Sequence, residues 1–347
     1  MTAKWARICA AILSLSVTAL GSAPASADEG GVSFWLPGQF GSLAAVPGQP
    51  GWSFASVYYH TSVNAGGDVA AARQVTIGRL NPTVNVNLNA NLDARADLVF
   101  LNANYVFATP VLGGQFAFGM TGAFGRPNAS IDGTLTTVVG GVTTTRQGSI
   151  SDSRGGVSDL YPLASLRWNQ GVNNFMTYLT GDIPVGTYDS TRLANVGIGH
   201  GAVDGGVGYT YFNPQTGREF SVVTGLTYNL TNDHTGYQNG IDWHVDWGLS
   251  QFLSKQFFVG AVGYFYDQLT ADSGAPAILG DNKSRVAGLG PQIGYLFPVG
   301  GMQGYLNLKG YKEFGAEHRP EGWNVWLTFA ISPAAEIPPA TSRPVRK

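Results

Sequence analysis

The sequence predicts an all-β protein, an antiparallel transmembrane β-barrel of about 12 strands. Three observations favour this fold: long segments alternate apolar and polar residues, short and long connections follow one another, and the chain begins with a secretory signal. Only 12% of the 347 residues are Asp, Glu, Lys or Arg, against about 25% in an ordinary soluble domain. The formal net charge of −2 excludes a basic nucleic-acid-binding protein.

Residues 1–27 have the features of a signal peptide. Lys4 and Arg7 precede an apolar run over residues 8–20, and small residues follow up to Ala27. The run is too short for a membrane anchor, since a helix needs roughly 20 apolar residues to span a bilayer. Cleavage after Ala27 would remove Cys9, the only cysteine, so we expect no disulfide in the mature chain.

Residues 28–50 form a segment that differs from the strands after it. They carry apolar side chains among glycines and prolines, which is too apolar for a free tail and too irregular for a strand. Since one inserted segment can close a twelve-stranded lumen, we expect this segment to act as a plug inside the barrel. The side chains expected to fill the lumen are Phe34, Trp35, Leu36 and Phe40.

Residues 51–332 hold the expected barrel strands. The clearest one runs from Ile241 to Leu249, where every odd residue is apolar and the even ones are charged, polar or small. This alternation is typical of a strand with one apolar and one hydrated face. The same period predicts strands near residues 51–63, 83–107, 113–126, 156–169, 173–184, 200–213, 217–231, 240–253, 256–270, 285–297, 302–315 and 321–332.

The connections between these strands alternate in length. Four are short and rich in turn residues, whereas the stretches 127–155, 185–199, 232–239 and 271–284 are longer. Short turns at one end and long loops at the other are typical of outer-membrane barrels. Loop 127–155 predicts a projecting hairpin around Gly140 and Gly141. The proline-rich tail 333–347 predicts a disordered periplasmic end.

Two points stay open at the level of strands. A soluble β-sandwich also alternates, although aromatic residues gather at strand ends and the polar faces are rich in glycine and asparagine, which favours the barrel. The segment 83–107 changes phase at Leu98 and Val99. This change predicts a bulge there or a hairpin inside the first loop.

Several motifs in the same order resemble a known family. The motifs lie at residues 31–38, 184–189, 237–240, 290–295, 304–311 and 319–324. The first contains Phe34-Trp35-Leu36-Pro37 and the fourth contains Pro291-Gln292. This pattern is similar to the meta-pathway phenol degradation (MetA-type) family of outer-membrane proteins, from about residue 29 to 331. The resemblance implies an outer-membrane barrel that is found with aromatic-compound catabolism and passes hydrophobic substrates. It carries over no functional residue.

A set of polar residues is expected to line the lumen, because Trp243 and Trp247 on the same strand would face lipid. Three interpretations remain: a hydrated wall whose charges pair with neighbours, a constriction that attracts cations or orders a polar headgroup, and a metal site, which lacks a second element with His or Cys. The expected lumen-lining residues are Asp242, His244, Asp246, Gln292, Asn307 and Lys309.

The first strand carries a pattern that some enzymes share. His60, Ser62 and Asn64 share one face, and His-x-Ser weakly resembles the active strand of outer-membrane phospholipase. A nucleophilic serine needs a base within hydrogen-bond reach and a group that orients this base. The spacing permits this geometry without requiring it, so we assign no catalytic residue.

These observations predict an outer-membrane channel for passive transport of small hydrophobic or aromatic compounds in a Gram-negative cell. Its expected partners are outer-membrane lipid and the transported molecule, with no nucleic acid and no cofactor. Two other functions remain open: a barrel enzyme that acts on lipid, and a surface barrel with a structural or adhesive role.

Overall fold

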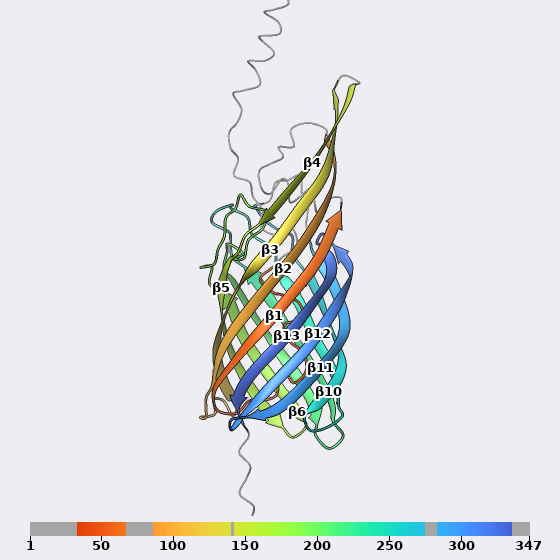
Figure 1. Cartoon of the computed structure of the whole chain (residues 1–347). Helices are drawn as coiled ribbons and strands as arrows, with labels where there is room; N and C mark the ends of the chain where they lie inside the picture. Colours follow the sequence, from red (N-terminus) through yellow and green to blue (C-terminus); the bar gives the residue numbers. More distant parts are fainter. Residues whose placement is uncertain (1–32, 67–85, 140–141, 275–282, 335–347) are drawn as a thin grey trace, which may run out of the picture.

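A computed structural model describes residues 33–66, 86–139, 142–274 and 283–334. Within these ranges the chain is all-β and forms thirteen strands (Figure 1). None of the described residues belongs to an apolar helix long enough to cross a membrane. The strands are β1 (Gly51–Gly66), β2 (Val86–Val106), β3 (Gln115–Val139), β4 (Val142–Ser153), β5 (Gly156–Gln170), β6 (Asn173–Asp182), β7 (Ala202–Asn213), β8 (Arg218–Asn229), β9 (Asp242–Phe252), β10 (Phe257–Gln268), β11 (Arg285–Val299), β12 (Met302–Glu317) and β13 (Glu321–Pro333).

Twelve of these strands close into one antiparallel barrel. Each strand pairs with its neighbours in the chain, and β1 pairs with β13, for example Phe54 with Ile331, so that the sheet has no open edge there. β4 is the exception, because it pairs only with the outer part of β3 and leaves the lower part of β3 to pair with β5. The prediction of an all-β antiparallel barrel of about 12 strands is confirmed.

The hairpin expected within loop 127–155 is present, and it consists of two long paired strands. β3 continues to Val139, which pairs with Val142 at the start of β4. In Figure 1 this β3–β4 pair projects beyond the rim of the barrel. The strand therefore extends beyond the predicted range 113–126, because its threonine-rich continuation pairs with β4 instead of forming a loop.

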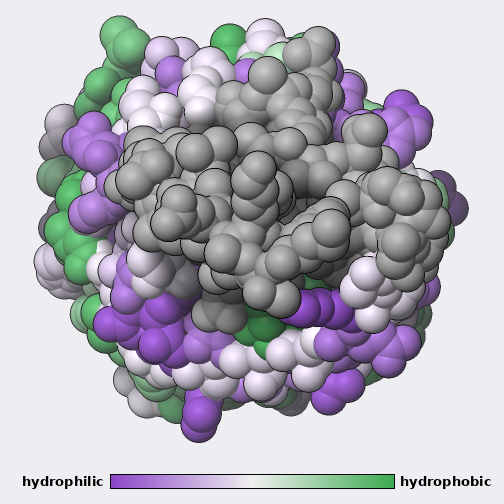
Figure 2. All heavy atoms as spheres, turned by 90° about the horizontal axis from the view of Figure 1, so that it is seen from above, coloured by the Kyte–Doolittle hydropathy of each residue, from purple (hydrophilic) through white to green (hydrophobic). Residues whose placement is uncertain are grey.

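The outer face of the barrel carries an apolar belt. Large hydrophobic side chains point away from the barrel and are exposed, among them Trp52, Phe54, Leu101, Leu249 and Trp323. Seen along the barrel axis (Figure 2), hydrophilic side chains gather around the rim and hydrophobic side chains appear on the outer flank. An exposed apolar band bounded by aromatic residues is what a lipid bilayer covers.

The phase change in β2 has a different cause from the one expected. β2 pairs with β1 and β3 in an unbroken register, so the described strand contains neither a bulge at Leu98 nor a second hairpin. Even residues point inward throughout: Leu92 is buried and Leu98 lines an internal cavity, whereas Asp93 and Asp97 are exposed. The pattern inverts because the upper part of β2 has an apolar inner face and a hydrated outer face.

Candidate functional site

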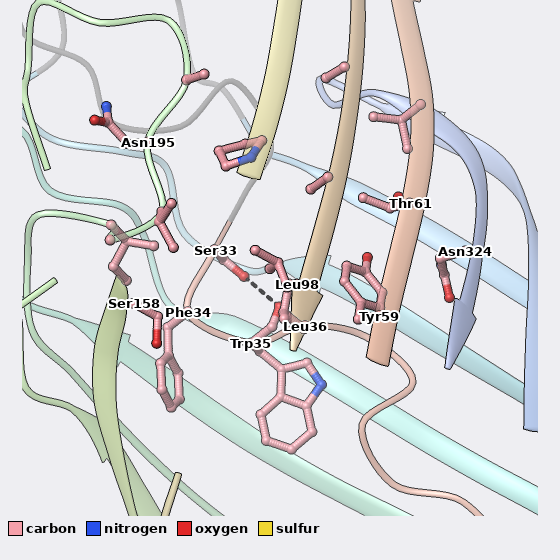
Figure 3. A pocket seen from close by; sticks show the side chains of 18 of the residues that line it. Ser33, Phe34, Trp35, Leu36, Tyr59, Thr61, Leu98, Ser158, Asn195 and Asn324 are labelled. Carbon is pink, nitrogen blue, oxygen red and sulfur yellow. Dashed lines mark hydrogen bonds between the residues drawn. The ribbon is translucent and has the colours of Figure 1, made fainter. Parts of the chain in front are cut away.

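The N-terminal segment before β1 lies inside the barrel and makes contacts with its inner wall. Phe34 and Trp35 are buried, and Leu36 and Phe40 pack against the same aromatic cluster as these two residues. Figure 3 shows Phe34, Trp35 and Leu36 between strands that come from different parts of the sequence. The segment leaves the interior at Gly51, where β1 begins.

Two charged side chains of the wall hold the backbone of this segment at Gly38–Phe40. The two carboxylate oxygens of Asp246 accept hydrogen bonds from the backbone N–H groups of Gly38 (2.9 Å) and Phe40 (3.0 Å). The Lys309 ammonium donates to the carbonyl oxygens of Gly38 (2.5 Å), Gln39 (3.2 Å) and Phe40 (3.2 Å). One anion and one cation from β9 and β12 thus bind donors and acceptors of the same short loop.

Gly38 is required by the shape of this loop. Its φ of +90° is a conformation that residues with a side chain rarely adopt. A Cβ atom built at this position would lie 3.0 Å from the Tyr311 ring and 3.2 Å from the Tyr264 ring. The glycine therefore lets the backbone pack closely against these two rings.

A second contact fixes Trp35 above the wall. Its indole stacks on the His244 imidazole, with ring centroids 3.5 Å apart and planes inclined by 13°. The Nε2 atom of His244 lies 2.8 Å from a carboxylate oxygen of Asp204, and both side chains are fully buried. The carboxylate orients the imidazole, and the imidazole offers a flat surface to Trp35.

Polar side chains also bind the segment nearer to β1. Leu43 N–H donates to Glu219 (2.9 Å) and Ala45 N–H to Thr210 (3.0 Å). The hydroxyl of Ser42 lies 2.7 Å from that of Ser250 and 2.7 Å from the amide nitrogen of Gln292. Arg167 donates a hydrogen bond to the carbonyl oxygen of Ala44, and Gln115 donates one to the carbonyl oxygen of Gly48.

The structure places all six residues expected to line the lumen on the inner wall, where each is buried. Asp246, Gln292 and Lys309 bond to the N-terminal segment, and His244 stacks on it. The other two bond within the wall: Asp242 accepts from Asn229 (2.9 Å), and Asn307 donates to the carbonyl oxygen of Ile293 (3.1 Å).

Several residues that bond to the segment were not singled out from the sequence, and neither was Asp204, which orients His244. The residues bonded to the segment are Gln115, Arg167, Thr210, Glu219 and Ser250. Asp204 stands before two glycines, and Thr210 lies between tyrosines. A single polar residue on a glycine-rich strand gives no signal that separates it from an ordinary wall position. Only strand parity could have placed these side chains on the inner face.

An apolar cavity of about 350 Å³ lies inside the barrel next to the N-terminal segment. Phe34, Trp35 and Leu36 form part of its lining, and Leu98 and Phe100 of β2 line another side. Tyr59, Tyr161 and Leu163 complete this aromatic and aliphatic wall, as Figure 3 shows for the labelled Tyr59 and Leu98.

The long connection between β6 and β7 contributes the remaining side of the cavity. Leu193, Ala194 and Val196 are buried there. The Asp159 carboxylate fixes the connection by accepting from Gly186 N–H and Ile198 N–H, both at 2.7 Å.

Two more carboxylates order the same connection. Asp152 of the β3–β4 hairpin accepts from the N–H groups of Leu193 and Ala194, both at 3.1 Å, and pairs with Arg192. The Thr191 hydroxyl and N–H bond to Asp189 within the connection and lower the pKa of the Asp189 carboxyl. The connection is thus held in place by carboxylates that accept hydrogen bonds from its backbone.

His60 and Ser62, the enzymatic pattern on β1, lie on the outer face of the barrel wall, away from the cavity. Tyr58 on the same face of β1 is an exposed side chain, and the nearest partner of His60 is Asp97, whose carboxylate oxygen lies 2.8 Å from Nδ1. In the described part of the chain, no hydrogen bond joins His60 to Ser62. Nor does any group of His, Cys, Asp and Glu among the described residues have the arrangement of a metal site.

These features define a class of protein: an outer-membrane β-barrel whose lumen holds an N-terminal segment and an apolar cavity. Residues 61–329 match the family model described as "Putative MetA-pathway of phenol degradation", and the chain belongs to this family. The resemblance found in the sequence is therefore confirmed. None of the curated proteins matches the chain.

Solved structures share the fold at low sequence identity. The chain is similar to the COG4313 outer membrane channel from Pseudomonas putida F1, with 13% identity, 86% of this chain and 99% of that chain covered, and a TM-score of 0.60. It is also similar to a FadL homologue of Pseudomonas aeruginosa, with 8% identity, 81% and 89% covered, and a TM-score of 0.38. The first of these likenesses shows the outer-membrane channel fold.

Proposed function

We propose that this protein is an outer-membrane channel through which small hydrophobic or aromatic compounds enter the cell passively. The observation that carries the proposal is the apolar cavity of about 350 Å³ inside the barrel, bounded by the N-terminal segment. Cavities of about 300–1,000 Å³ with mostly apolar walls are typical of sites for small organic molecules.

The lining of the cavity favours apolar over polar solutes. Most of the polar groups near it are already bonded to protein: Ser33 donates to the carbonyl oxygen of Trp35, and Asn324 bonds to Tyr264 and Trp326. A sugar or amino acid would lose its hydration there without gaining new partners. An aromatic ring would instead bury apolar surface, at about 25 cal/mol per Å².

The family and the relatives support the same class of substrate. The description of the family names phenol degradation, and the similar structure from Pseudomonas putida F1 is called an outer membrane channel. The apolar belt on the outer face fits a position in the outer membrane, reached after removal of the signal peptide expected at residues 1–27.

The N-terminal segment has the role of a plug in this proposal. It occupies the lumen between the cavity and the end at which β1 begins. Side chains of β5, β7, β8, β9 and β12 bind its backbone, and Gln292 of β11 binds its Ser42 hydroxyl. Passage therefore requires this segment to shift. A passive channel needs no cofactor for such a movement, only a closed and an open state of similar free energy.

Uptake into whole cells tests the proposal. We expect cells that carry the gene to accumulate radiolabelled toluene, phenol or fatty acid faster than cells that lack it, while labelled glucose serves as the hydrophilic control. Deletion of residues 30–46 should raise the permeability to both kinds of solute, because the plug is gone. Equal rates for every hydrophobic compound with and without the gene would refute a channel of this class.

A further inference from the structure

One cation in the cavity forms no ion pair within 4 Å of a described carboxylate. Arg319, in the turn between β12 and β13, lines the cavity and is half-buried. One face of its guanidinium lies over the Tyr266 ring, 5.0 Å from the ring centroid. Its Nε atom is buried, and no hydrogen bond or ion pair joins the guanidinium to another described residue.

Of the other charged groups at the cavity, Arg95 of β2 is exposed to solvent, whereas Arg192 and Glu313 have partners in the wall. Arg192 pairs with Asp152 and also donates to the carbonyl oxygen of Ser153 (3.3 Å). Glu313 is buried, and its two carboxylate oxygens accept from the Tyr264 hydroxyl and from Gly322 N–H, both at 2.8 Å. Among the cavity cations of the described chain that are at least half-buried, Arg319 is therefore the one without an ion pair.

A half-buried guanidinium beside an apolar cavity gains a charged hydrogen-bond partner when an anion enters the cavity. A guanidinium has five N–H donors and no acceptor, and it matches a carboxylate in geometry and charge. The Tyr266 ring covers one of its faces and leaves the donors at its edge for another partner. A neutral apolar molecule would fill the cavity and leave these donors unused.

We propose that the cavity takes amphipathic molecules with one anionic group, a carboxylate above all, which Arg319 binds while the apolar walls enclose the rest. The inference rests on the proposed function and narrows its substrate class. Aromatic and aliphatic acids fit this description, whereas amines do not, because a cationic group would face Arg319.

A matched pair of probes tests the proposal. Purified protein in lipid nanodiscs is dialysed against radiolabelled 4-butylbenzoate and against its methyl ester, and binding to empty nanodiscs is subtracted. The wild type should bind the benzoate more tightly than the ester at neutral pH. Arg319→Met should weaken benzoate binding by about tenfold or more, since a hydrogen bond to a charged group contributes about 1.5–3 kcal/mol, and should leave ester binding nearly unchanged.

Two variants serve as controls. Arg319→Lys keeps the charge and should retain part of the preference for the benzoate. Arg285→Met removes a cation that pairs with Glu317 and is exposed at the rim, outside the cavity lining, and should leave both affinities unchanged. Heat-modifiable mobility in gels shows whether each variant has assembled.

The outcomes separate the two proposals. If the wild type binds the ester as tightly as the benzoate, or if Arg319→Met weakens both probes equally, the role of Arg319 is refuted and the channel proposal stands. If the wild type binds neither probe and cells with the gene accumulate toluene no faster than cells without it, both proposals are wrong.

Discussion

Replacement of Asp246 by asparagine should loosen the N-terminal segment without unfolding the barrel. The carboxylate accepts from Gly38 N–H at 2.9 Å and from Phe40 N–H at 3.0 Å, one bond to each oxygen. In Asp246→Asn, one oxygen is replaced by an NH₂ group, which cannot accept from the second N–H. The negative charge that faces Lys309 is lost as well.

The size of the effect follows from the lost bond. A hydrogen bond to a charged group contributes about 1.5–3 kcal/mol, and every 1.4 kcal/mol changes an equilibrium by about tenfold. The fraction of molecules whose segment is displaced should therefore rise by about 10- to 150-fold. Planar-bilayer recordings should show this as a matching increase in the time spent in a conducting state.

Asp242→Asn is the matched control for this experiment. Asp242 lies on the same strand and the same inner face, but its carboxylate accepts from Asn229 of the wall, at 2.9 Å. Asp242→Asn also removes one negative charge, but it leaves the bonds to the N-terminal segment intact. The fraction of time that this variant spends in a conducting state should therefore remain close to that of the wild type. If assembled Asp246→Asn opens no more often than the wild type, or if both variants open equally often, the segment is not held by Asp246 as described.

Three further predictions concern the plug, the lipid-facing wall and the topology. The Ser42→Cys/Ser250→Cys double variant should form a disulfide, because the two hydroxyl oxygens lie 2.7 Å apart. Oxidation should lower the uptake of hydrophobic compounds until dithiothreitol restores it, and unchanged uptake in the oxidised protein would contradict the plug role. Val245→Arg places a cation on the lipid face and should cost about 2–4 kcal/mol, which heat-modifiable gel mobility would report as impaired assembly; normal assembly would mean that the face assignment is wrong. An epitope inserted at Gly140 should bind antibody on intact cells and one at Ser254 should not, and the opposite result would invert the barrel.

The strands were predictable because a barrel wall between lipid and lumen alternates its side chains with period two. β9 shows this best: Trp243 and Leu249 are exposed on the outside, while Asp242 and Asp246 are buried within. The rule failed in the upper part of β2, where Leu92 points inward. Alternation reports that the two faces differ, but not which face is lined by lipid and which by an apolar cavity.

The site was predictable only in part, for a physical reason. Strand parity placed Asp246 and Lys309 on the inner wall, but their partners are backbone N–H and C=O groups of Gly38–Phe40. Every residue except proline carries both of these groups, so no side-chain pattern shows which segment they belong to. The cavity was equally hidden, because it depends on how β2, β5 and the β6–β7 connection meet in space.

The irregular N-terminal segment and the charged residues on the inner wall explain each other. A segment without regular secondary structure that enters a barrel loses water from its backbone N–H and C=O groups, and it has no ladder in which to pair them. A charged residue on the inner wall likewise needs a partner when the lumen is filled. Asp246 and Lys309 supply an acceptor and a donor to the loop around Gly38, and the loop neutralises the cost of burying both charges. The buried loop and the buried charges would each be unfavourable alone, so a change to one should weaken the binding of the other. This is the behaviour expected of a plug that can be displaced as a unit.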